Sequence, residues 1–176
     1  MTFMRNWSAL TSLILAAGLL HGQTGTPPMQ AVGPYRTSTV TMTNSFATTG
    51  LVLPSIPINT VRYGQCKILW AMSSISYTAT FGIGMSAAPT DLWGSSQVTY
   101  AAAGTSNYLT FTQTATTATA ISSAATAGVA STIYLAEINF TLQTGSSAVV
   151  VTLYGETSSA SGTLTIEPGS YCAWLR

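Results

Sequence analysis

The chain has 176 residues, enough for one domain with a sizeable core, yet Lys, Arg, Asp and Glu make up only 5% of it, against about 25% in a typical soluble domain. Its formal net charge is +1 and its basic residues form no run, which excludes the electrostatic footprint of a nucleic-acid-binding protein. The abundance of Thr, Val, Ile, Tyr and Phe excludes an intrinsically disordered chain and favours a folded β protein.

Residues 1–22 have the features of a secretory signal peptide. Arg5 supplies the positive charge, an apolar stretch runs from Trp7 to Leu20, and small residues follow it. The alternative is a retained membrane anchor. Beyond this segment no apolar run reaches the roughly 20 residues that a membrane-spanning helix needs. We therefore expect a protein that is secreted, extracellular or at the cell surface, and that has no membrane contact once the signal is removed.

Residues 23–34, QTGTPPMQAVGP, contain three prolines and no hydrophobic periodicity, which predicts an extended arm before the folded domain at 35–176. Alternation of apolar and polar residues begins at Val40–Met42. The next segment, 65–85, predicts two central strands with a turn at 73–76, and Cys66, Ile68, Trp70 and Met72 share a face of the first. Pro89, Asp91 and Gly94 then predict a long loop over 86–97.

Strand character resumes at 109–112, and the Ala, Thr and Ser residues after Gln113 predict short strand pieces and turns. The clearest pattern is in 134–143, where Tyr134, Ala136, Ile138, Phe140 and Leu142 occupy one face. Two further alternating stretches follow, at 149–154 and 163–167. Many short strands with no amphipathic helix predict an all-β fold, an antiparallel β-sandwich, with a jelly roll as the expected arrangement.

Two cysteines, Cys66 and Cys172, follow the signal segment. An even pair in an oxidising compartment favours one disulfide, and two buried free thiols are the alternative. Their spacing matches no zinc site.

The segment 133–176 resembles the closing strands of the TNF-like jelly-roll domains of phage tail and virion surface proteins. The resemblance lies in a long strand, a Gly/Ser hairpin, another strand, a small-residue turn and the step TIEPGSY into a final strand. It covers about a quarter of the chain, and the apparent signal peptide departs from a virion protein. The resemblance implies a homo-oligomer, and it implies that the last strand lies beside a central one, which would bring Cys172 to Cys66.

Catalysis is not expected. The one histidine, His21, lies in the signal segment, so its removal leaves no His for a general base or a nucleophile pair. The acids are scattered: Asp91, Glu156 and Glu167 are interpreted as turn residues, and Glu137 as solvated or paired with an arginine. We predict no catalytic residue, no metal site and no cofactor.

Three residues are candidates for contacts with sugars. Trp93, interpreted as a loop residue, and Tyr108 could stack on a sugar ring, although a Trp of this kind also packs within its own loop. Asn139 begins the sequence Asn-Phe-Thr, which matches an N-glycosylation site, although it also suits an ordinary strand.

Two functions from different classes fit these observations. The first is a non-catalytic structural subunit of an extracellular homo-oligomeric assembly, a filament, fibre or surface coat, because near-zero charge favours association. Its copies would join through sandwich faces or through strand addition by the arm. The second is a trimeric phage-like decoration or receptor-binding domain, or a carbohydrate-binding adhesin. The expected partners are copies of the chain itself and glycans, and not nucleic acid.

Overall fold

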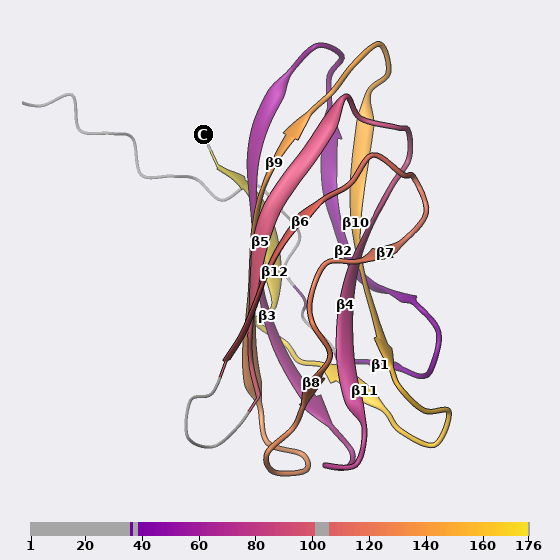
Figure 1. Cartoon of the computed structure of the whole chain (residues 1–176), viewed down its shortest axis with the longest axis vertical. Helices are drawn as coiled ribbons and strands as arrows, with labels where there is room; N and C mark the ends of the chain where they lie inside the picture. The colour runs from indigo at the N-terminus through magenta and orange to yellow at the C-terminus, as the bar shows by residue number, and fades with distance from the viewer. Residues whose placement is uncertain (1–35, 37–38, 101–105, 176) are drawn as a thin grey trace, which may run out of the picture. The chain divides into compact units, whose positions relative to one another are not determined.

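Two antiparallel β-sheets packed against each other make up the structure, a computed structural model (Figure 1). It describes Arg36, residues 39–100 and residues 106–175, which belong to one unit of the chain, Ala31–Arg176. These residues include no helix, so the prediction of an all-β antiparallel sandwich is confirmed. The predicted signal peptide 1–22, with His21, and the arm 23–34 lie outside the described residues.

The first sheet has seven strands in the order β1-β11-β3-β9-β5-β6, and β12 also pairs with β3. Its strands are β1 (Val40–Met42), β3 (Val61–Met72), β5 (Asp91–Thr99), β6 (Ser106–Thr112), β9 (Tyr134–Gln143), β11 (Leu164–Ile166) and β12 (Tyr171–Leu175). The second sheet has the order β2-β10-β4-β7, and β8 also pairs with β4. Its strands are β2 (Ala47–Ile56), β4 (Thr78–Met85), β7 (Thr119–Ala120), β8 (Ala125–Thr126) and β10 (Val149–Thr157).

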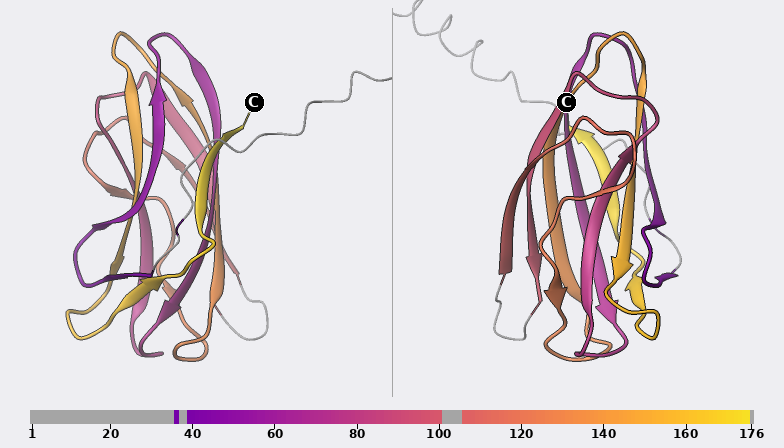
Figure 2. Two further views of the ribbon diagram at one scale, coloured as in Figure 1. Left: turned by 180° about the vertical axis from the view of Figure 1, so that it is seen from behind. Right: turned by 45° about the vertical axis from the view of Figure 1, so that its right-hand side comes forward.

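The chain winds between the sheets in the manner of a jelly roll. It crosses from one sheet to the other at every connection except β5–β6, β7–β8 and β11–β12 (Figure 2). Because β11 and β12 pair with successive parts of β3, they act as one interrupted strand beside it. The β5–β6 hairpin extends the first sheet beyond β9.

The core lies between the sheets and follows the predicted alternation. Trp70 of β3 is fully buried, and its ring packs edge-on against Phe81 of the second sheet at 6.1 Å and beside Tyr134 at 5.3 Å. The five alternating residues of β9 named above are all buried. Period-two patterning therefore identified the inward face of the central strands correctly.

Large aromatic rings and glycines alternate across five strands on the inner side of the first sheet. Trp174, Gly64, Phe140, Gly94 and Phe111 stand opposite one another in register, and we call them the aromatic–glycine row. A Cβ atom on either glycine would lie within 3 Å of the Phe140 side chain. Gly64 therefore makes room for the ring of Phe140, and Gly94 makes room for the ring of Phe111 beside the Cβ atom of Phe140.

The long loop predicted over 86–97 is wrong, because β5 begins at Asp91 and includes Gly94. Gly94 belongs to the aromatic–glycine row and not to a turn. Asp91 is accordingly the first residue of a strand, and Glu156 lies within β10. Glu167 follows β11 at a turn, as predicted.

Uncharged side chains satisfy many of the buried backbone groups. Ser96 Oγ donates a hydrogen bond to the carbonyl of Ile121 at 2.6 Å, and the Gln113 amide donates to the carbonyl of Ile83 at 3.0 Å. Trp174 Nε1 donates to the carbonyl of Pro54 at 2.8 Å and so links the two sheets. Hydroxyl, amide and indole groups thus provide polar contacts that need no ionic side chains.

A disulfide joins Cys66 and Cys172, which confirms the predicted pair. The two residues stand opposite each other in β3 and β12, and both are buried. The bond links positions 106 residues apart in sequence and fixes the last strand to the centre of the first sheet.

Candidate functional site

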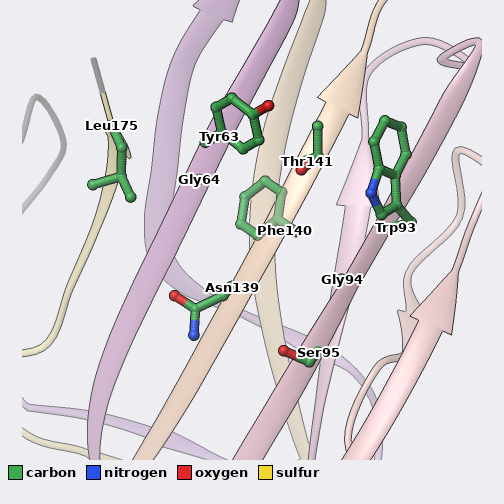
Figure 3. A pocket seen from close by; sticks show the side chains of 9 residues that line it. All are labelled: Tyr63, Gly64, Trp93, Gly94, Ser95, Asn139, Phe140, Thr141 and Leu175. Atoms are coloured by element: carbon green, nitrogen blue, oxygen red, sulfur yellow. The ribbon is translucent and has the colours of Figure 1, made fainter.

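A groove of about 270 Å³ lies on the outer face of the first sheet, at the end where β3 begins (Figure 3). Three strands, β3, β9 and β5, supply most of its lining, and β12 supplies Leu175. We call it the outer-face groove; its lining is Tyr63, Gly64, Trp93, Gly94, Ser95, Asn139, Phe140, Thr141 and Leu175.

Strand register explains the groove. Thr141 of β9 stands directly opposite Tyr63 of β3 on one side and Trp93 of β5 on the other. Two strand spacings separate the aromatic residues, roughly 10 Å between their backbones. A small, mostly buried threonine between two large side chains leaves a depression, as Figure 3 shows. Tyr63 is 60% exposed and Trp93 is 39% exposed, so both rings are available to a ligand.

A polar row borders the aromatic residues. Two residues from Thr141 along β9, Asn139 stands opposite Gln65 and Ser95, and Gln65 Nε2 donates a hydrogen bond to Asn139 Oδ1 at 2.9 Å. The next position holds the ion pair of Lys67 and Glu137, with 3.1 Å between Nζ and Oε1. Glu137 is therefore paired with a lysine and not with the predicted arginine. The face thus combines aromatic surface with amide and hydroxyl groups.

The hydrogen bond and the charge of Glu137 raise the pKa of Lys67, and Tyr171 adds a smaller electrostatic contribution. Because the pKa is raised in the folded state, the pair stabilises the fold below the ordinary lysine range near pH 10.4 and this stabilisation is lost above it. Both side chains are substantially exposed, so we expect a contribution of only about 0.2–1 kcal/mol.

We predict that wild-type protein loses slightly more stability than the Lys67→Met variant when the pH rises from 8 to 11.5. Lys67 is the only lysine in the chain, so the difference between the two proteins isolates this ammonium group from the tyrosines. Urea unfolding of both proteins at each pH measures it. Parallel pH profiles would show that the pair contributes nothing.

The structure separates the two aromatic residues predicted to contact a ligand. Trp93 lines the groove, but it does so from a strand and not from a loop. Tyr108 is on the same outer face and is 71% exposed, yet it stands opposite Gln97, four residues along β5 from Trp93, and does not line the groove. Sequence reasoning missed Tyr63. This residue lies near Trp93, across Thr141, only because β3 and β5 both pair with β9.

Asn139, the predicted glycosylation residue, is exposed and lines the groove, whereas Thr141 of the same motif is 8% exposed. A sugar attached to Asn139 would therefore extend over the groove. Glycosylation remains a prediction, and it would compete with any other ligand of this site.

The acidic residues do not gather at the groove. Within residues 39–100 and 106–175, no group of three or more His, Cys, Asp or Glu side chains is placed to hold a metal ion. Across the same described part of the chain, no helix is long and apolar enough to cross a membrane.

Comparison with protein-family models and with curated proteins found no match. The resemblance of residues 133–176 to TNF-like jelly-roll domains therefore remains a prediction.

Proposed function

We propose that the chain is a non-catalytic structural subunit of an extracellular homo-oligomeric assembly, such as a filament, fibre or surface coat. The observation that carries this proposal is an exposed apolar patch made by three of the groove's lining residues and Val61 next to them. Val61 and Tyr63 of β3 and Trp93 of β5 are 46%, 60% and 39% exposed on the outer face, and Leu175 lies next to Tyr63. We call these four residues the outer-face patch.

Three further features support the proposal. Contiguous apolar surface on a folded domain commonly marks an interaction site. Because the net charge of the whole chain is only +1, the electrostatic repulsion between copies is weak. The disulfide is consistent with an oxidising, extracellular location.

Sedimentation velocity and electron microscopy of the native exported protein test this proposal. We expect assemblies larger than a monomer, and we expect Val61→Lys to weaken association at least about tenfold, a change of about 1.4 kcal/mol in the free energy of association. The matched control is Val52→Lys, the same change at a valine of similar exposure, 42%, on the second sheet. A wild-type protein that stays monomeric at high concentration would contradict the proposal.

A second candidate function, carbohydrate binding by an adhesin or decoration domain, is favoured by the outer-face groove itself. Sugar rings stack on aromatic side chains, and amide groups such as those of Asn139 and Gln65 provide hydrogen-bond donors and acceptors for hydroxyls. The groove presents aromatic rings and the amide of Asn139 within one depression, and Gln65 lies next to it as the hydrogen-bond partner of Asn139.

On a glycan array, we expect Trp93→Ala to reduce binding at least about tenfold, because it removes one aromatic wall. Tyr108→Ala is the matched control, since that ring lies on the same face outside the groove and its loss should leave binding unchanged. Wild-type protein that binds no glycan, while assemblies are visible, would favour the structural function alone.

A further inference from the structure

The edge strands of the two sheets differ in how they are protected against pairing with another strand. Most of them carry a recognisable guard. β1 has only three residues, and β7 and β8 have two each. β12, which pairs with β3 alone, has five, and the backbone of Arg36 is hydrogen-bonded to Gly169 and Ser170 just before it. β2 is longer, but it contains Pro54, a glycine with positive φ at position 50, and two register irregularities against β10. Short length, proline and bulges are the devices that discourage strand addition.

The edge strand β6 has none of these devices. It is seven residues long, Ser106–Thr112, and it pairs with β5 in unbroken register. Its sequence, SNYLTFT, contains no charged residue, no proline and no glycine. Among the described edge strands, it is therefore the longest one that no charge, proline, glycine or bulge interrupts, and so the one best suited to accept a further strand.

Backbone geometry shows which groups β6 offers. The N–H of Gln113, just after the strand, donates to the carbonyl of Leu92 in the segment of β5 at 2.7 Å. Because antiparallel hydrogen bonding alternates along a strand, residues 107, 109 and 111 direct their N–H and C=O groups to β5. Residues 106, 108, 110 and 112 direct theirs to the open edge.

We propose that β6 pairs with β6 of a second copy of this chain, antiparallel and about a two-fold axis at Leu109, so that the first sheet continues from one copy into the other. This inference rests on the proposed structural function and names one of its contacts. Full overlap of the two strands would form about eight backbone hydrogen bonds, two for each of four opposed pairs.

A second copy fits this edge for two reasons. A two-fold axis at Leu109 places Tyr108 opposite Thr110 of the partner subunit, and the same aromatic and β-branched pair recurs on the other side of the axis. Neither strand carries a charge, so the pairing meets no repulsion, and β6 offers no charge with which to select an acidic or basic peptide.

The edge and the outer-face patch are separate surfaces. Tyr108 is four register positions from Trp93, and the pairing uses backbone groups at the end of the sheet, whereas the patch lies on its face. Two different self-contacts on one chain are enough to build an extended assembly, whereas a single two-fold contact stops at a dimer.

The test uses the exported full chain and two variants of one residue. Thr110→Pro removes an N–H that faces the open edge and spares the bonds to β5, which edge strands tolerate. Thr110→Lys keeps the N–H and places two positive charges close to the axis. Thr110→Val is the matched control that keeps both the backbone group and the β-branched shape. Near-ultraviolet circular dichroism and thermal unfolding establish that each variant is folded.

Sedimentation velocity should show association at least about tenfold weaker for Thr110→Pro and Thr110→Lys, and unchanged for Thr110→Val. Hydrogen exchange should show the amides of Tyr108, Thr110 and Thr112 protected in wild-type assemblies and exchanging freely in these two variants. The patch variant Val61→Lys should shrink the assembly while leaving those three amides protected.

The outcomes separate the two proposals. If wild-type protein assembles while those three amides exchange freely and both variants associate normally, the β6 inference is overturned and the structural function stands. If deletion of residues 23–34 removes the protection, the arm and not β6 occupies the edge, which also overturns it. A wild-type monomer would contradict both.

Discussion

Replacing Cys66 and Cys172 together with alanine should lower the free energy of unfolding by about 4–5 kcal/mol, the largest single effect expected in this protein. The disulfide closes a loop between positions 106 residues apart, and chain entropy assigns a loop of this length a contribution of about 4.7 kcal/mol. For a domain whose total stability is on the order of 10 kcal/mol, this is a large share.

Urea unfolding of the double variant and of the wild type measures this effect. Wild-type protein treated with reductant but no denaturant is an internal control. Both cysteines are buried, so the disulfide should resist reduction until the sandwich unfolds. With reductant and denaturant together, wild type should approach the stability of the variant. A difference below about 1 kcal/mol between the two proteins would contradict the loop-closure explanation.

Phe140→Ala should be the second most damaging change, at about 3–5 kcal/mol, the range for truncating a buried aromatic residue. Phe140 is 4% exposed, and its ring occupies the space that Gly64 leaves open, whereas the ring next to Gly94 is that of Phe111. Since neither glycine has a side chain that can move into the gap, the cavity should collapse poorly. The edge-on contact with Trp174, at 5.5 Å between ring centres, would be lost as well.

Phe111→Ala is the matched control for this prediction. It makes the same chemical change within the aromatic–glycine row, but on the edge strand β6, where Phe111 is only partly buried. We expect it to cost clearly less than Phe140→Ala in the same denaturation series. Equal losses would show that the space that Gly64 leaves for the Phe140 ring has no special role.

The sequence was sufficient for the features that repeat along a single strand. Alternation identified β9 and the inward face of β3, and two cysteines after an expected secretory signal indicated the disulfide. It was not sufficient at Gly94, because a glycine that makes room for a ring looks the same locally as a glycine in a turn. The rings that explain Gly94 come from β6 and β9, and only pairing brings them together.

Only part of the groove could be predicted, because strand pairing brings its residues together. An exposed tryptophan is a reasonable candidate for ligand contact wherever it occurs, so Trp93 was identified without its neighbours. Tyr63 and the small Thr141 can be assigned to the groove only from the register of β3, β9 and β5, which places Thr141 between Tyr63 and Trp93. Tyr108 was grouped with Trp93 by proximity in sequence, but the β5–β6 pairing places it farther along the sheet.

The covalent link between β12 and β3 also determines how the domain would respond to mechanical tension. In an antiparallel pair, a force applied to one end of an outer strand can break its hydrogen bonds one after another, starting from that end. Here a pull applied beyond Leu175 could detach only Ala173, Trp174 and Leu175 before it reached Cys172. From there the force passes through the disulfide into β3, which is hydrogen-bonded to β9 along most of its length. A subunit joined to its neighbours in a fibre would therefore resist being pulled apart strand by strand.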